Sequence, residues 1–233
     1  MKTIGVLGGL GPQATMEFER RVHEASQRLI PQRGNSGYPP MVVMYMRDAP
    51  VLLHDDGSPI LPIQINPRIL EVAAQLGGVA DFIVITANGP HMMRAQIEEA
   101  SGLKVLSMTD MAIEEMKRRG WKKVGVLGLG EPLVYLEPLK AMGIATESID
   151  GELRANLDQA IIGLMEGRTG NESTGRALAA VTALRERGVE GVLLGCTEIP
   201  LMLGQHAHAP DLIDPGALLA EAAVRYAMQE QEG

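Results

Sequence analysis

The stretch "TIGVLGGLGP" (residues 3–12) decides the fold class. A short apolar run is followed directly by glycines and a proline, which is typical of a buried strand that turns tightly into a helix. A similar stretch, "KVGVLGLGEP", occupies residues 123–132. A second pair, "ADFIVITANGP" (80–90) and "VEGVLLGCTEIP" (189–200), follows in the same order, at offsets of roughly 110 to 120 residues. The repeat indicates two similar α/β lobes.

Short apolar runs alternate with helix-period segments along the whole chain. The runs are continuous and rich in Val, Ile and Leu, as in parallel strands buried on both faces. They cover residues 3–9, 39–46, 80–88, 104–108, 122–130 and 190–196. The helix-period segments cover residues 15–29, 66–76, 92–100, 110–119, 153–165, 175–187 and 217–228. This alternation predicts an α/β fold, with ligands bound beyond the carboxyl ends of the strands.

Composition excludes several classes of protein. The chain has 233 residues, a formal net charge of −8 and no cluster of Lys and Arg, which argues against a nucleic-acid partner. The first residues lack a secretory pattern, and no run of about 20 apolar residues occurs, so we expect a cytoplasmic protein with no membrane partner. The single cysteine excludes an internal disulfide.

Candidate functional residues lie in the loops that follow the predicted strands. The backbone around Gly9, in "GGLGPQAT", could hold an anion, although the glycine spacing does not fit a dinucleotide fingerprint. Asn88 could hydrogen-bond a carboxylate or cap a turn locally. Cys196 is either a reactive thiol or a buried structural one. His206 and His208 have no further ligands at metal spacing, so we predict no metal site.

The motifs "GGLGPQAT", "ANGPH", "KKVGVLG" and above all "LLGCTEIP" resemble those of the cofactor-independent aspartate/glutamate racemases, over nearly the whole chain. The resemblance implies two Rossmann-like lobes related by a pseudo-twofold axis, with the active site in the cleft between them. Residues 1–101 plus 210–233 would form the first lobe and residues 102–209 the second. The expected enzyme is a PLP-independent isomerase that needs no cofactor, forms a homodimer and acts on a small acidic amino acid.

In such racemases one cysteine from each lobe flanks the α-carbon, so that one thiolate removes the proton and the opposite thiol returns one. Cys196 matches the second of these thiols. The first normally stands one or two residues before the asparagine that matches Asn88, and here Thr86 and Ala87 occupy those positions. A threonine hydroxyl lacks the acidity of a thiol, so we expect Thr86 to orient the substrate or donate through a water.

The resemblance also suggests residues that bind the substrate. Asn88 and Thr197 match positions that bind the α-carboxylate, and Glu198 matches the acidic neighbour of the second cysteine. Arg154 matches a basic position that holds a substrate carboxylate, and Arg47 is a second candidate clamp; the alternative for both is a solvated surface charge. Two further family threonines are replaced. They correspond to Gly89 and Leu129.

Three classes of function remain open. The first is a racemase that produces D-amino acids with Cys196 and Thr86; its inversion is expected to be slow or unequal between enantiomers, because inversion needs a proton donor on each face. The second is a decarboxylase or lyase that uses one cysteine. The third is an amino-acid-binding protein without turnover. For the catalytic classes, a position at a loop or helix start predicts a lowered thiol pKa for Cys196.

Overall fold

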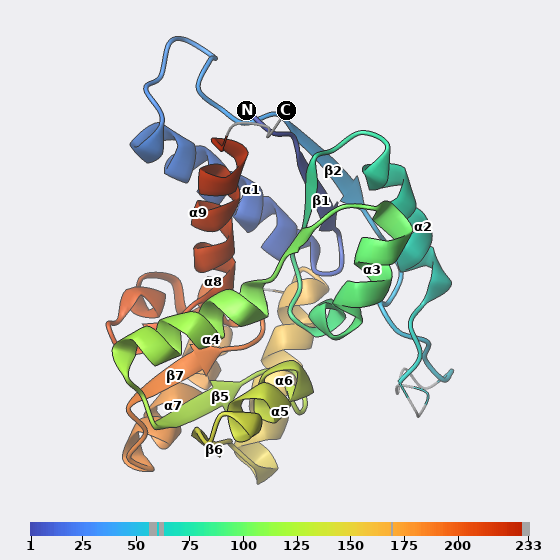
Figure 1. Ribbon diagram of the computed structural model, residues 1–233. Coiled ribbons are helices and arrows are strands. Elements are labelled where there is room, and N and C mark those ends of the chain that lie inside the picture. Colours follow the sequence, from blue (N-terminus) through green and yellow to red (C-terminus); the bar gives the residue numbers. More distant parts are fainter. Residues whose placement is uncertain (56–59, 61–62, 169, 230–233) are drawn as a thin grey trace. The chain divides into compact units, whose positions relative to one another are not determined.

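The fold is α/β with parallel sheets, as predicted (Figure 1). The structure, a computed structural model, describes residues 1–55, 60, 63–168 and 170–229. The chain forms two compact units: one consists of Met1–Ser107 together with the segment from Leu219 onward, and the other of Met108–Leu218. That these units are separate domains with boundaries near residues 101 and 209 stays a prediction.

The first unit is built on a parallel sheet with the strand order β2-β1-β3-β4. Its strands are β1 (Ile4–Gly8), β2 (Met41–Tyr45), β3 (Phe82–Ile85) and β4 (Val105–Leu106). Its helices are α1 (Pro12–Leu29), α2 (Pro67–Gly77), the 3₁₀ helix η1 (Gly89–Met93), α3 (Arg94–Ser101) and most of α9 (Pro215–Ala227).

The helix α9 is joined to the first sheet by hydrogen bonding and by ring packing. The Lys2 N–H donates to the Ala227 carbonyl oxygen at 2.8 Å, and the ring of Tyr226 packs edge-on against Phe82 with 4.8 Å between centroids. The apolar face of the helix from Leu219 onward is buried. The last described helix therefore completes a unit that the first residues of the chain begin.

The second unit repeats this topology with the strand order β6-β5-β7-β8, again parallel. Its strands are β5 (Lys123–Leu127), β6 (Ala145–Glu147), β7 (Gly191–Leu194) and β8 (Leu212–Ile213). Its helices are α4 (Met108–Arg119), α5 (Leu133–Ala141), α6 (Gly151–Met165), α7 (Asn171–Glu186), α8 (Glu198–Leu203) and the 3₁₀ helix η2 (Gly204–His208). The two repeated pairs of motifs in the sequence occupy the two central strands of each sheet.

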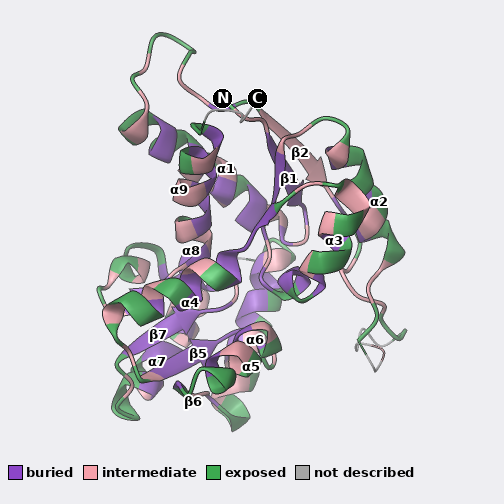
Figure 2. Cartoon of the chain, in the orientation of Figure 1, coloured by how far each residue is buried: buried purple, intermediate pink, exposed green. Residues whose placement is uncertain are grey.

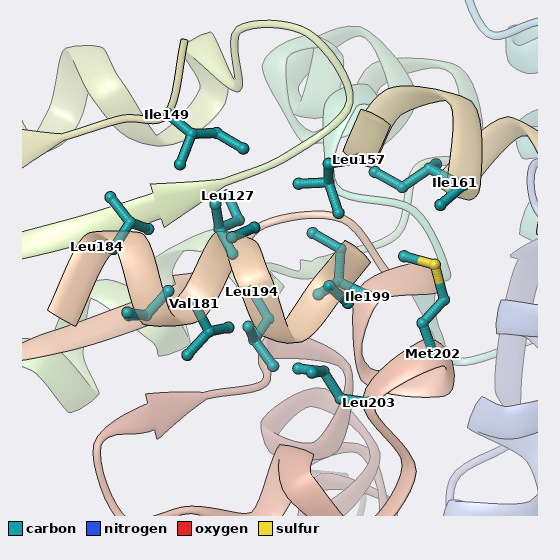
Figure 3. Close-up of a cluster of buried hydrophobic side chains, with 14 of the residues drawn as sticks. Leu127, Ile149, Leu157, Ile161, Val181, Leu184, Leu194, Ile199, Met202 and Leu203 are labelled. Carbon is teal, nitrogen blue, oxygen red and sulfur yellow. The ribbon is translucent and has the colours of Figure 1, made fainter. Parts of the chain in front are cut away.

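The core of the second unit fixes the turn that follows β7. Leu127 and Leu194, from the two central strands, pack with Leu184 of α7 and with Ile199 of α8 (Figure 3). All four side chains are fully buried, and each stabilises the fold by roughly 1.5–3 kcal/mol. Figure 2 shows the same division throughout: the central strands are buried and the outward helix faces are exposed. Because Ile199 is anchored, the preceding residues 195–198 have a defined position.

Five of the described elements were not expected from the sequence, namely α5, β6, α8, the 3₁₀ helix η2 and β8. The helix α5 contains Pro138, which normally ends a helix, and α8 has only 6 residues. The strand β6 reads Ala-Thr-Glu and has no apolar run, and the two residues of β8 are flanked by Asp211 and Asp214. Within the described ranges, no helix combines the length and the apolar character required to cross a membrane.

Candidate active site

Cys196 lies two residues beyond the end of β7, at the carboxyl edge of the second sheet. Leu127 and Leu194 are register partners, and the Gly195 N–H donates to the Leu127 carbonyl oxygen at 2.7 Å. A Cβ atom at Gly195 would lie 2.7 Å from that oxygen and 3.2 Å from the ring of Tyr135, so only glycine fits there. Close packing of Gly195 against Leu127 of β5 and against Tyr135 therefore fixes the chain just beyond β7. The next residue, Cys196, has a half-buried thiol.

The thiol of Cys196 is hydrogen-bonded to a buried carboxylate. Its Sγ donates to Oε2 of Glu198 at 3.0 Å, and the hydroxyl of Thr197 donates to the same oxygen at 3.0 Å. Glu198 is only 3% exposed, although it is an ionisable residue. Three consecutive residues thus form one acid/base cluster, in which the carboxylate is positioned to accept the thiol proton.

The pKa of the Cys196 thiol is raised well above its usual range, first by burial and then by the charge and hydrogen bond of Glu198. Backbone hydrogen bonds from Glu198 and Leu129 lower this pKa but do not overcome the other causes. The expectation of a lowered thiol pKa is therefore wrong in its net direction, because a buried anion beside the sulfur outweighs the backbone donors. At neutral pH Cys196 rests as a thiol and is a proton donor.

Arg154, expected to bind a substrate carboxylate, donates to atoms of its own unit. Its Nε and Nη2 donate to the Ile149 carbonyl oxygen at 3.0 Å and 2.7 Å, Nη2 also donates to the hydroxyl of Ser148, and Nη1 donates to the carbonyl oxygen of Gly130. These bonds account for all but one of the guanidinium N–H groups. In this structure Arg154 joins the start of α6 to the loop that follows β5.

In the first unit, Gly9 is shaped by close backbone packing. Its φ is +78°, and an added Cβ atom would lie 2.5 Å from the Met46 carbonyl oxygen, so glycine is required. The Gly9 N–H, a candidate anion donor, donates to the hydroxyl of Thr15 at 2.9 Å.

Thr86 is 2% exposed, and its Oγ1 lies 2.8 Å from Oγ1 of Thr15, so its hydroxyl is directed toward α1. Leu7 pairs with Ile85 in the first sheet, just as Leu127 pairs with Leu194 in the second. Two residues beyond each of these strand positions stand Ala87 and Cys196. By register, the counterpart of the cysteine is therefore half-buried Ala87, and Thr86 is its neighbour.

The remaining candidates of the first unit lie near the carboxyl ends of β3 and β2. Asn88 is buried at the start of η1, where its carbonyl oxygen accepts the His91 N–H at 3.1 Å. Gly89 is exposed, and an added Cβ atom would have no other atom within 4 Å, so a larger residue would fit. Arg47 is exposed, with its guanidinium carbon 4.7 Å from the ring centre of Tyr45.

The structure brings Cys196, Thr197 and Glu198 into one cluster and links Gly9 and Thr86 through Thr15. Sequence reasoning missed Thr15 and also Asp158, which accepts the Gly130 N–H at 3.1 Å. Asp158 follows Arg154 by four residues, and this spacing on one helix face was the available signal. Across the part of the chain that is described, no group of three or more His, Cys, Asp or Glu side chains could hold a metal ion.

Comparison with known proteins identifies the family. The model of the Asp/Glu/Hydantoin racemase family matches residues 7–223. The chain is 24% identical over 226 residues to the broad specificity amino-acid racemase RacX of Bacillus subtilis, covering 95% of this chain and 96% of that protein.

Solved structures share the fold. The aspartate racemase of Picrophilus torridus gives a TM-score of 0.75 at 19% identity, over 97% of this chain and 94% of that one. An aspartate racemase homologue from Pyrococcus horikoshii gives a TM-score of 0.73 at 21% identity, over 98% of this chain and 100% of that one. Since the family match spans nearly the whole chain and includes the motif around Cys196, the protein belongs to the Asp/Glu/Hydantoin racemase family.

Proposed function

We propose that this protein racemises an amino acid without a cofactor and that Cys196 acts as the acid and base on one face of the α-carbon. The observation that carries the proposal is the hydrogen bond from the Cys196 thiol to the buried carboxylate of Glu198, at 3.0 Å. Family membership supports the reaction type, and the named activity of the Bacillus relative supports an amino-acid substrate.

Proton transfer begins within the Cys196 cluster. Because the resting sulfur is protonated, it must first pass its proton to Oε2 of Glu198 before it can act as a base. The thiolate then removes the α-proton and leaves a carbanion that the substrate carboxylate stabilises. Return of a proton from Cys196 to the same face restores the starting enantiomer, so this step alone gives exchange without inversion.

Inversion requires a proton on the opposite face, where this chain has no second thiol. We propose that water supplies that proton and that the hydroxyl of Thr86, held by Thr15 at 2.8 Å, positions it. The hydroxide left behind is neutralised through solvent by the proton that Glu198 took from the thiol, which returns the enzyme to its resting state. Water and hydroxyl groups are far weaker acids than a thiol. The expected enzyme therefore exchanges the α-proton faster than it inverts the carbon.

The proposed substrate is an acidic amino acid, aspartate or glutamate. Thr197 and Asn88 are the proposed partners of the α-carboxylate. Gly89, which directly follows Asn88, and Gly9, in the loop after β1, are proposed to contribute backbone contacts. Arg47 supplies an exposed cation near the end of β2 for the side-chain carboxylate. The named activities of the relatives, aspartate racemisation and broad specificity, make aspartate the first substrate to test and a wider panel the second.

Incubation with each enantiomer of aspartate and glutamate in heavy water tests this function. We expect α-deuterium to appear faster than the opposite enantiomer, with both products formed and no carbon dioxide released. Carbon dioxide release would indicate the single-cysteine decarboxylase instead. Binding without exchange or inversion, across the acidic substrates and the wider panel, would indicate a protein without turnover.

Glu198→Gln is expected to change thiol reactivity and turnover in opposite directions. The carboxylate charge helps to raise the Cys196 pKa, so its removal lowers that pKa and shifts the rise of alkylation rate to lower pH. Turnover should nevertheless fall by about a hundredfold, because glutamine cannot accept the thiol proton. Iodoacetamide alkylation and racemisation are measured on the same samples, with exposed Glu137→Gln as the charge-matched control. Parallel changes in both quantities would contradict the proton-acceptor role.

We further propose, from the family resemblance, that the protein works in the cytoplasm as a homodimer. Light scattering at micromolar concentration measures the mass directly. A mass near 25.0 kDa, that of one chain, would contradict the dimer.

A further inference from the structure

Gly130, in the loop between β5 and α5, is held on both of its backbone polar groups by side chains of α6. Nη1 of Arg154 donates to the Gly130 carbonyl oxygen, and Oδ1 of Asp158 accepts the Gly130 N–H at 3.1 Å. The two side chains are four residues apart, so they lie on the same helix face. We name this pair of side chains the Gly130 clamp.

The Gly130 clamp is itself rigidly supported. Other nitrogens of Arg154 donate to the Ile149 carbonyl oxygen and the Ser148 hydroxyl, which orients the guanidinium. The helix α6 is anchored in the core of the unit by Leu157 and Ile161, which are 1% and 0% exposed (Figure 3). The left-handed backbone of Gly130, with φ of +58°, is a conformation that glycine adopts without strain. The loop is therefore fixed to a packed helix.

The residue before Gly130 contacts the sulfur. The backbone of Leu129 hydrogen-bonds Cys196. The sheet explains this contact, because Leu127 and Leu194 are register partners on neighbouring strands, and Leu129 and Cys196 each stand two residues farther along. The Gly130 clamp holds the two peptide groups that follow the Leu129 Cα atom, so a shift of the loop at Gly130 would displace Leu129 and carry its N–H away from the sulfur.

We propose that Arg154 and Asp158 are positioning residues: by holding Gly130 they keep the Leu129 N–H directed at Cys196, where it stabilises the thiolate formed during turnover. A donor that is oriented before the charge develops stabilises it without reorganisation. The proposal rests on the acid/base role of Cys196 proposed above. It gives Arg154 a role that requires no contact with substrate.

The other groups that act on the sulfur are separate from the Gly130 clamp. Glu198 lies on the turn of the cysteine itself. Tyr135 of α5 interacts electrostatically with Cys196 and with Asp214, and the pKa of its hydroxyl is raised first by burial and then by Asp214 and Cys196. Variants of Arg154 and Asp158 leave these three side chains in place. A change in thiol reactivity in such variants therefore reports on the loop.

Iodoacetamide alkylation of Cys196 in the full-length protein, followed over pH, tests the proposal. We expect Asp158→Ala to raise the thiol pKa and to slow alkylation about tenfold at a fixed pH below it, because a hydrogen bond to the charged sulfur is lost. The loss of the Asp158 charge alone would shift the thiol pKa in the opposite direction, because removing a nearby carboxylate favours the thiolate and lowers that pKa. Arg154→Lys keeps the charge but loses the planar fork, and it should also slow alkylation.

Two controls separate positioning from general damage. Asp158→Asn retains an oxygen that accepts the Gly130 N–H and should react nearly as the parent protein does. Glu152→Ala removes an exposed carboxylate from the same helix and should not change the rate. Folded Asp158→Ala protein that reacts as fast as the parent, or faster, overturns the proposal. If that variant does not fold, an unchanged rate for Arg154→Lys overturns it. Alkylation needs no turnover, so slowed alkylation in a protein without racemase activity would contradict the proposed function alone.

Discussion

Replacing Cys196 by serine is expected to lower both α-proton exchange and inversion by at least about a thousandfold. The serine hydroxyl can take over the hydrogen bond to Glu198 that the thiol makes at 3.0 Å, so the local geometry is retained. Its pKa, however, lies far above that of any thiol, and the carboxylate cannot generate an alkoxide from it. The loss should therefore fall on the turnover number, with little change in substrate binding.

The measurement combines deuterium uptake, optical rotation and thermal unfolding of the serine variant. Unfolding should shift by only a few degrees, because the side chain is half-buried and nearly isosteric. A variant that still exchanges the α-proton at the parental rate would remove Cys196 from the chemistry. Loss of exchange with an unchanged unfolding temperature is the outcome that the proposed mechanism requires.

Ala87→Cys is expected to accelerate inversion about a hundredfold, to a rate close to that of exchange. The register of the two sheets makes Ala87 the counterpart of Cys196, and its half-buried position can hold a thiol. A thiol at position 87 would donate a proton to the face of the α-carbon opposite Cys196. It would thereby replace protonation by water, the step that we propose to be slow. The ratio of inversion to deuterium exchange, measured from both enantiomers, reports this directly.

Two comparison variants make this result interpretable. Ala87→Ser has a similar size without the acidity and should give no gain. Thr86→Cys removes the hydroxyl that we propose positions the water and loses its contact with Thr15, at a cost of about 1 kcal/mol. Because that side chain is directed toward α1, the new thiol should not accelerate inversion. Equal rates for the cysteine and serine variants at position 87 would contradict the register argument. Strong acceleration by Thr86→Cys would identify Thr86 as the residue facing the substrate.

The fold class was predictable because the four central strands are continuous apolar runs, three of which end at or directly before a glycine, and both pairs recur along the chain. The edge strands β6 and β8 carry no such signal, because β6 has one apolar residue, Ala145, and the two residues of β8 lie between Asp211 and Asp214. The helix α5 was not predicted because it contains Pro138. In a sequence a proline indicates the end of a helix, although this structure accommodates one inside α5.

Only part of the candidate site could be predicted from the sequence. Cys196, Thr197 and Glu198 are consecutive, so a turn brings them together and the sequence could group them. Thr15 and Thr86 are 71 positions apart, and only the folded sheet shows that their hydroxyls meet. The sign of the thiol pKa shift was not predictable, since it depends on burial and on the orientation of the Glu198 carboxylate.

The position of α9 has a consequence for synthesis of the chain on the ribosome. The helix that packs on Phe82 through Tyr226 is translated after every strand of the first sheet. Until α9 has been synthesised, the apolar surface of the first unit that contacts this helix stays exposed to solvent. This exposure lasts while the whole segment Met108–Leu218 is translated. Translation arrested before Leu219 would thus release a product whose first sheet exposes hydrocarbon, a natural substrate for chaperones and proteases.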